Sequence, residues 1–209
     1  DSIVDLVKKH YSGKFVFPND IEIVTGGFPC QDFSVAGKRN GFKSHKSHQN
    51  KVIDNNSKAD EENRGQLYIW MREVINIVKP KVFIAENVKG LISLSDAKRI
   101  IEDDFRNIDE GYIVVDAKVL HAGNYGVPQS RERIFFVGLK KSALTPKALR
   151  ALQKTPIDPE YDPYPPKTHS LSKELTLFNF NEAEQTLDLV PVKEVLKNLL
   201  EPMFAKNDL

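Results

Sequence analysis

Cys30 has the surroundings of a reactive thiol. It is the only cysteine of the chain, and it stands in the run Gly26-Gly27-Phe28-Pro29-Cys30-Gln31-Asp32-Phe33-Ser34. The apolar, β-branched residues 21–25 come before this run and predict a buried strand that ends at the glycines. A free cysteine is more often a core residue. Here the glycine-rich turn and the polar neighbours Gln31 and Asp32 favour an exposed thiol, which could act as a nucleophile.

Glu86 places a carboxyl group at the end of a second apolar run. Glu86 and Asn87 follow the apolar residues 82–85 without a break. A Glu-Asn pair by itself is common in surface loops and helix caps. Because Glu86 continues a predicted buried strand, its carboxyl group needs a charged or hydrogen-bonding partner, or else a raised pKa. The carboxyl ends of neighbouring strands share one edge of an open α/β sheet, so we expect Glu86 near Cys30.

Two arginines stand at the start of a third apolar run. Arg131 and Arg133 precede residues 134–139 and are two positions apart, so their side chains point to the same side of the predicted strand. Arginine suits pairing with a carboxylate or with the oxygen of a nucleobase. A plain surface ion pair, with Glu132 simply exposed, is the alternative interpretation.

Strands and helices alternate along the chain and predict an α/β fold with a largely parallel sheet. The predicted strands are 21–25, 82–85, 112–120 and 134–139, and the predicted helices are 66–79, 96–107, 145–154 and 192–200. Pro80 ends the first helix, and Ser95 or Asp96 caps the second. Residues 156–166 are rich in proline and predict an extended segment.

Three motifs in a fixed order resemble those of the DNA cytosine-5 methyltransferases. They are Gly-Phe-Pro-Cys-Gln at 27–31, Glu-Asn-Val at 86–88 and Gln-x-Arg-x-Arg at 129–133, and the resemblance covers about residues 20–139. It implies a partial Rossmann-like S-adenosylmethionine-dependent methyltransferase sheet, mostly parallel with an antiparallel last strand. We expect a catalytic domain over residues 1–145. Residues 146–209 would be a linker and the start of the region leading to a target-recognition domain.

The resemblance also implies roles for the catalytic residues. The thiolate of Cys30 would add to C6 of a cytosine and make C5 nucleophilic towards a methyl group. Glu86 would hydrogen-bond N3 and the exocyclic amine of that base. Arg133 would hold the base carbonyl oxygen and orient Glu86, and Arg131 would support the site.

Duplex DNA and S-adenosylmethionine are the partners that the resemblance implies, with the target cytosine flipped out of the duplex. The residues expected at the substrate or DNA are Phe28, Gln31, Ser34, Lys38, Asn87 and Gln129, and those expected at the methyl donor are Pro29 and Leu67. Residues 36–63 carry many lysines and few apolar side chains. We expect a mobile loop that contacts phosphates, with a merely solvated loop as the alternative.

Composition limits the remaining possibilities. The chain has 209 residues, is 40% hydrophobic and carries a net charge of +1, so DNA contact must come from a local patch. One cysteine excludes an intrachain disulfide and fits a reducing compartment, here the bacterial cytoplasm with the nucleoid. No apolar run approaches the roughly 20 residues of a membrane span. A restriction-modification system is the expected setting, and no metal is expected.

The family's glycine-rich donor segment and its target-recognition domain have no counterpart here. Residues 1–3 match only the end of the strand that would come before residues 21–25, and 192–200 resembles the linker to the recognition domain. We therefore expect this chain alone to be catalytically silent, with a strand at 21–25 whose unpaired edge favours self-association.

Two other functions remain open at this point. The chain could be an inactive fragment that only binds DNA or a partner. It could also be an unrelated thiol enzyme in which Cys30 pairs with one of the five histidines, none of which stands in a strand-end motif. A metal site at His45 and His48 is weaker still, because no third ligand lies nearby in the sequence.

Overall fold

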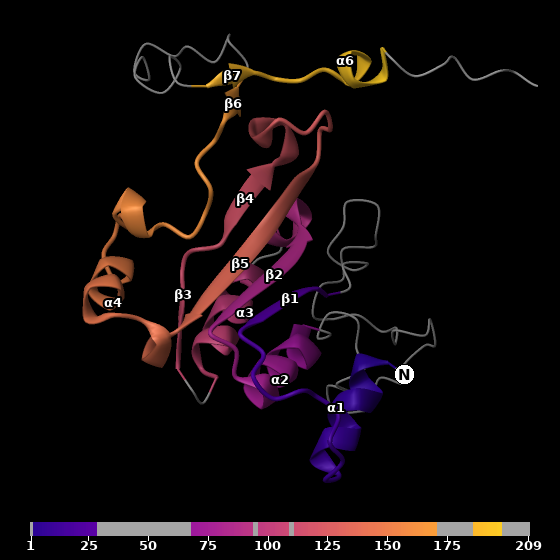
Figure 1. Ribbon diagram of the computed structural model, residues 1–209, viewed down its shortest axis with the longest axis vertical. Helices are drawn as coiled ribbons and strands as arrows, with labels where there is room; N and C mark the ends of the chain where they lie inside the picture. The colour runs from indigo at the N-terminus through magenta and orange to yellow at the C-terminus, as the bar shows by residue number, and fades with distance from the viewer. Residues whose placement is uncertain (1, 29–67, 94–95, 109–110, 171–185, 198–209) are drawn as a thin grey trace, which may run out of the picture. The chain divides into compact units, whose positions relative to one another are not determined.

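A computed structural model describes residues 2–28, 68–93, 96–108, 111–170 and 186–197 (Figure 1). The chain divides into two compact units. The first comprises Asp1–Leu120 and Arg133–Tyr164, and the second comprises His121–Glu132 and Pro165–Leu209. The expected boundary after residue 145 stays a prediction.

The first unit is built around a mixed sheet. Its strands β1 (Ile23–Gly27), β2 (Val82–Val88), β5 (Glu132–Lys140) and β3 (Tyr112–Val114) lie in the order β1-β2-β5-β3, and β4 (Lys118–His121) also pairs with β5. β1 and β2 are parallel, whereas β5 is antiparallel to both β2 and β3. β1, β2 and β3 therefore share one direction, and β5 runs against them. The predicted α/β class, mostly parallel with an antiparallel last strand, is confirmed.

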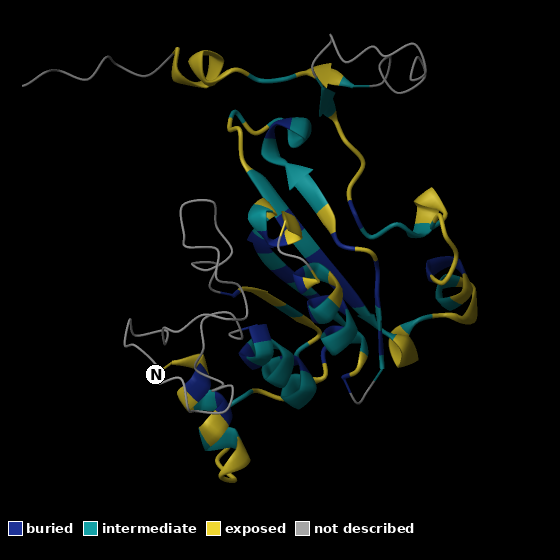
Figure 2. Cartoon of the chain, turned by 180° about the vertical axis from the view of Figure 1, so that it is seen from behind, coloured by how far each residue is buried: buried dark blue, intermediate teal, exposed yellow. Residues whose placement is uncertain are grey.

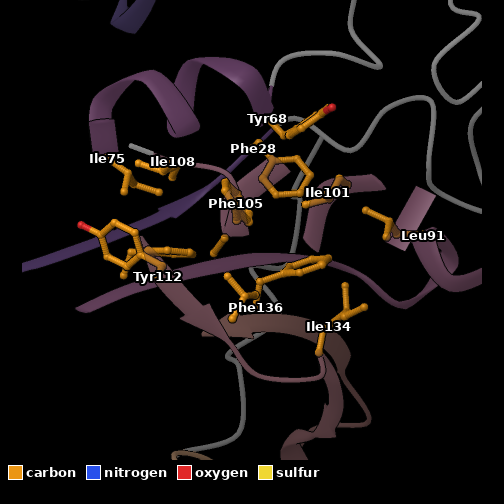
Figure 3. Packing of buried hydrophobic residues seen from close by; sticks show 14 of the residues in the cluster. Phe28, Tyr68, Ile75, Leu91, Ile101, Phe105, Ile108, Tyr112, Ile134 and Phe136 are labelled. Atoms are coloured by element: carbon orange, nitrogen blue, oxygen red, sulfur yellow. The ribbon is translucent and has the colours of Figure 1, made fainter. Parts of the chain in front are cut away.

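One face of the sheet carries the main core. Phe83 and Ala85 of β2 alternate with half-buried neighbours, and Phe136 of β5 lies on the same face. Helices α2 (Tyr68–Val78) and α3 (Ala97–Arg106) supply Ile75 and Phe105 to this cluster. Figure 3 shows Ile75, Phe105 and Phe136 together in this cluster, and Figure 2 shows the buried stretches of β2 and β5. Burial alternates along β2, with Phe83, Ala85 and Asn87 buried on the core face.

The opposite face of the sheet is covered over β5 and β3. Val137, Val115, Leu152 of α4 (Pro146–Leu152) and Tyr164 form a second buried cluster. The Tyr164 hydroxyl donates to the Phe135 carbonyl at 2.8 Å and ties this covering segment to β5. A short 3-10 turn, η6 (Pro159–Tyr161), interrupts the segment at 156–166 that the sequence predicted to be extended.

β1 corrects the prediction of a buried strand at 21–25. The strand is Ile23–Gly27, it lies at the edge of the described sheet, and Ile23 is 60% exposed. Its apolar residues met the criterion for a buried strand, but burial needs a neighbour on both sides. In the described part of the chain β1 has a neighbour strand on one side alone.

Helix α1 (Ile3–Tyr11) corrects the interpretation of residues 1–3 as a strand remnant. Ser2 caps the helix: its hydroxyl accepts from the Asp5 N–H, and the Asp5 carboxylate accepts from the Ser2 N–H. Val4 and Val7 pack on Trp70 of α2. Ser2 and Asp5, three positions apart, were the available signal for a helix start.

Two other strand predictions differ from the structure. β2 continues to Val88, so Glu86 and Asn87 lie inside the strand rather than after it. The strand predicted over 112–120 is divided into β3 and β4. The predicted helices at 66–79, 145–154 and 192–200 correspond to α2, α4 and α6 (Val192–Leu196) over the residues that are described.

In the second unit, the described residues form short elements. The 3-10 turn η4 (Ala122–Tyr125) lies beside β6 (His169–Ser170), where the Thr168 N–H donates to the Asn124 carbonyl at 2.9 Å. β6 pairs in parallel with β7 (Leu187–Asp188), and α6 follows.

Gly138 lies directly against the Phe83 ring in the main core. A Cβ at this position would lie 2.0 Å from the Phe83 ring, which is fully buried. We expect Gly138→Ala to lower the free energy of unfolding by about 3 kcal/mol, since the ring has no room to move. Urea denaturation measures this change. In a Phe83→Leu background, Gly138→Ala should lower the free energy of unfolding much less than it does in the wild type. An equal decrease in both backgrounds would contradict a clash between the alanine and the Phe83 ring.

Candidate active site

The structure describes half of the residues predicted at the site. Glu86, Arg131 and Arg133 are described, as are Phe28, Asn87 and Gln129. The others lie outside the described residues: Cys30, Pro29, Gln31, Ser34, Lys38, Leu67 and the loop 36–63.

Glu86 and Arg133 form an ion pair across two adjacent strands. In the antiparallel register, Glu86 faces Phe135 and Val88 faces Arg133, so Glu86 and Arg133 occupy diagonal positions on one face of the sheet. The Arg133 Nε donates to the Glu86 Oε1 at 2.8 Å, with 33% of the Glu86 side chain and 25% of the Arg133 side chain exposed. The ion pair thus holds the carboxylate in place, with a third of the Glu86 side chain exposed.

Gly27 borders the same carboxylate from the other side. It pairs with Glu86 in the parallel register of β1 and β2, and a Cβ on Gly27 would lie 3.1 Å from the Glu86 Oε2. A glycine here gives the carboxylate room beside the main chain of β1. Glu86 therefore lies between the end of β1 and the start of β5.

Asn87 points to the core face and fixes the chain just after β1. It is 2% exposed, and its Oδ1 accepts from the Val88 N–H at 2.8 Å. Its Nδ2 donates to the Phe28 carbonyl at 3.3 Å. A buried amide with both ends bonded holds its neighbours firmly, because breaking either bond would leave a buried polar group without a partner.

Phe28 is buried at the end of β1. Its side chain is 6% exposed and belongs to the main core, and its expected place at the substrate stays a prediction. Its ring centroid lies 6.1 Å from that of Tyr68 and 6.4 Å from that of Phe136. An aromatic side chain next to the end of a strand gains more by joining the core than by standing in solvent. Phe28 is therefore held in the core at the last described residue before the Pro29–Cys30 pair.

Arg131 and Gln129 belong to the second unit. They lie in an exposed turn in which the Gln129 N–H donates to the Val127 carbonyl at 2.7 Å and the Arg131 N–H to the Gln129 carbonyl at 3.0 Å. The Arg131 carbonyl accepts from the Ala122 N–H at 2.8 Å. Their convergence with Glu86 stays a prediction.

Two features of this region were not anticipated from the sequence. Gly27 was interpreted only as a strand end, because its closeness to Glu86 depends on the β1–β2 register. The hydrogen bond from the Tyr68 hydroxyl to Asp104, at 2.5 Å, joins residues far apart in the sequence and left no local signal.

Other features of the described residues lie away from these side chains. A pocket of about 510 Å³ is lined by Asp20, Glu22, Lys79, Lys81 and Lys140, residues that lie before β1 and β2 and at the end of β5. It is at the opposite end of the strands from Glu86. Among the described residues no group of three or more histidine, cysteine or acidic side chains could hold a metal ion. His45 and His48 lie outside the described residues. None of the described helices has the length and apolar character needed to cross a membrane.

The family model of the C-5 cytosine-specific DNA methylases matches residues 3–202. This chain belongs to that family. It is 39% identical to the type II methyltransferase M.HpaII of Haemophilus parainfluenzae over 131 aligned residues. This alignment covers 62% of the chain and 31% of the relative. It is 40% identical to M.Sau96I of Staphylococcus aureus over 122 aligned residues, and this alignment covers 58% of the chain and 24% of the relative. Among solved structures, the Dnmt2 methyltransferase of S. pombe has 18% identity and a TM-score of 0.35, covering 57% of this chain and 31% of that one.

The described part of this cytosine-5 methylase chain spans the second and third of the three motifs. The chain as a whole spans less than a third of the length of the two curated relatives. In it, Glu-Asn-Val forms the carboxyl end of β2, and the last arginine of Gln-x-Arg-x-Arg pairs with that glutamate.

The Glu86–Arg133 pair should be measurable as a coupling energy. In a double-mutant cycle of Glu86→Gln and Arg133→Gln, we expect about 1 kcal/mol of coupling in the free energy of unfolding, because both side chains are partly shielded from water. Urea denaturation measures it. The matched control is Lys154 and Asp158, a more exposed pair at 3.1 Å, for which we expect a few tenths of a kcal/mol. Equal coupling in both pairs would contradict the structural account of Glu86.

Proposed function

We propose that this chain is the catalytic part of a DNA cytosine-5 methyltransferase. The reaction transfers a methyl group from S-adenosylmethionine to C5 of a cytosine flipped out of duplex DNA. The observation that carries this proposal is the Glu86 carboxylate, held by Arg133 beside Gly27, at the point where β1 leads into the Phe-Pro-Cys-Gln motif. Family membership supports the same activity.

The covalent chain limits the distance between Cys30 and this carboxylate. Cys30 follows Phe28 by two residues, which span at most about 7 Å. Phe28 is fixed through its ring and its carbonyl, and Gly27 lies next to Glu86. A nucleophile and a carboxyl group within reach of one base are what the reaction requires.

The proposed reaction begins with the Cys30 thiolate. Its sulfur forms a bond to C6, and the electron pair of the C5–C6 double bond becomes available at C5. S-adenosylmethionine supplies the electrophilic methyl group, which C5 takes as the donor's S–CH₃ bond breaks. Loss of the C5 proton to a base then returns an electron pair, the C5–C6 double bond forms again and the bond from C6 to the cysteine sulfur breaks.

Glu86 and Arg133 stabilise the base during this addition. Glu86 hydrogen-bonds N3 and the exocyclic amine, and these bonds strengthen as electron density arrives from C6. Arg133 orients Glu86 through Nε. A guanidinium has five N–H donors, so the same side chain can also bind the carbonyl oxygen of the base. From the family resemblance we propose that Arg131 supports the site and that Gln129 binds the substrate or DNA. Asn87 holds the chain just after β1 through its bond to the Phe28 carbonyl.

The methyl donor fits the carboxyl end of β1. Thr25, Gly26 and Gly27 are exposed there, and glycines permit close approach to the main chain. Pro29 and Leu67 are the side chains that we propose to contact the donor. Gln31, Ser34 and Lys38, with the other cations of the loop 36–63, would bind the DNA backbone around the flipped base, whose unstacking costs a few kcal/mol.

We place this activity in a bacterial restriction-modification system, in the cytoplasm with the nucleoid. The curated relatives named type II methyltransferases support this setting.

Methyl transfer from labelled donor to duplex DNA tests the proposal. Because the chain spans under a third of its relatives, the assay uses it alone and in a chimera in which it replaces the aligned segment of M.HpaII. We expect methyl transfer by the chimera and none by the isolated chain. Cys30→Ser should abolish transfer with DNA binding retained, and Glu86→Gln should lower the chemical step more than DNA affinity. A chimera that keeps its activity with Cys30→Ser would refute the proposed nucleophile.

Self-association through β1 is a second proposal, supported by the edge position of this strand and the 60% exposure of Ile23. An exposed apolar edge strand favours pairing with another chain. In sedimentation of the isolated chain, we expect a dimer or larger species that Ile23→Lys disperses. The control Phe15→Lys, at a residue 77% exposed and outside the sheet, should leave the assembly intact. A wild-type monomer at all concentrations would contradict this proposal.

A further inference from the structure

Two buried aromatic residues border the segment 29–67 on either side. Phe28 is the last described residue before the segment, and Tyr68, which begins α2, is the first after it. They are 6% and 4% exposed, and their ring centroids lie 6.1 Å apart at 60°. Figure 3 shows both rings in the same cluster. The two described residues that border this segment therefore contact each other within the core.

Tyr68 is held by a hydrogen bond to a second helix. Its hydroxyl donates to the Asp104 Oδ2 of α3 at 2.5 Å, and its ring meets Phe105 edge-on at 6.5 Å and 90°. Burial, followed by the bond to Asp104, raises the pKa of Tyr68. The hydroxyl therefore stays protonated and remains a donor at neutral pH. A hydrogen bond to a carboxylate is stronger than one between neutral groups.

Phe28 in turn is fixed from three directions. Its carbonyl accepts from the Asn87 Nδ2 of β2 at 3.3 Å, and its ring packs against Phe136 of β5 and against Tyr68. Of these three contacts, only the one with Tyr68 comes from the far end of the segment. Closing a long segment costs conformational entropy, and the Phe28–Tyr68 contact, secured by Asp104, offsets that cost within the core.

We propose that Tyr68 is a positioning residue for the active site. Its ring, secured by Asp104, fixes Phe28, and Phe28 fixes where the residues after β1 begin. The inference deepens the proposed function, since its value for catalysis rests on the role of Cys30 two residues beyond Phe28. Tyr68 acts through Phe28 and does not touch the substrate.

The single cysteine of the chain makes this testable without DNA or methyl donor. The readout is the rate of Cys30 alkylation by iodoacetamide, from below to above the ordinary thiol pKa of about 8.5. We expect Tyr68→Phe to raise the alkylation rate severalfold and to shift the midpoint of its pH profile. The reason is that losing a bond to a charged acceptor increases local opening by about tenfold.

Tyr112→Phe is the matched control. Tyr112 is 1% exposed in the same core cluster, and its hydroxyl donates to the Pro80 carbonyl at 2.7 Å. Its loss should lower stability but leave the Cys30 profile unchanged. An equal change in both variants, or none in Tyr68→Phe, would overturn the proposal, because Tyr68 would then be an ordinary core residue.

Asp104 gives an independent test if Tyr68→Phe fails to fold. Asp104→Asn keeps an oxygen that accepts from the tyrosine and should retain the wild-type profile, whereas Asp104→Ala should change it as Tyr68→Phe does. Identical profiles for these two variants would also refute the proposal. Failure here is distinct from failure of the proposed function, which is decided by methyl transfer in the Cys30→Ser chimera.

Discussion

The reversed direction of β5 is the constraint on which the candidate site depends. Glu86 lies near the carboxyl end of β2, whereas Arg133 lies near the amino end of β5. In a wholly parallel sheet these two ends would lie on opposite edges. Because β5 runs against β2, the Glu86–Phe135 and Val88–Arg133 pairings bring the two charged side chains together at one edge. Arg133, at the start of β5, therefore lies beside Glu86, near the end of β2.

Successive side chains of β2 point to opposite faces of the sheet, so the residues that pack in the core and the candidate catalytic carboxylate lie on different faces. Phe83, Ala85 and Asn87 face the main core, where the first two pack against helices and Asn87 bonds the main chain after β1. Glu86 points to the other face, next to Gly27 and Arg133. A single strand therefore anchors the segment that carries the cysteine and presents the carboxylate. A shift of one residue in register would exchange these two faces and remove both functions.

Hydrophobic patterning predicted an α/β fold with a largely parallel sheet, and the family resemblance added the antiparallel last strand. The cost of burying a carboxylate required either a partner or a raised pKa for Glu86. The sequence could not supply the register that places Gly27 against Glu86, which is a property of strand pairing. The buried strand expected at 21–25 proved exposed at Ile23, since burial depends on neighbours that a pattern does not reveal. The burial of the Phe28 ring in the main core was likewise not predicted, because its motif gives no information on packing. The capping residues Ser2 and Asp5 did mark α1, and that local signal was missed.

The central claim is that Cys30 attacks a cytosine beside Glu86. It is tested most directly by mass spectrometry of the chimera after incubation with duplex DNA containing 5-fluorocytosine and with S-adenosylmethionine. Fluorine at C5 cannot leave as a proton does, so the bond from the cysteine sulfur to C6 should persist. The account predicts a DNA adduct on the peptide that contains Cys30, and none in Cys30→Ala. An adduct of equal yield in Cys30→Ala, or one mapped to another residue, would contradict it.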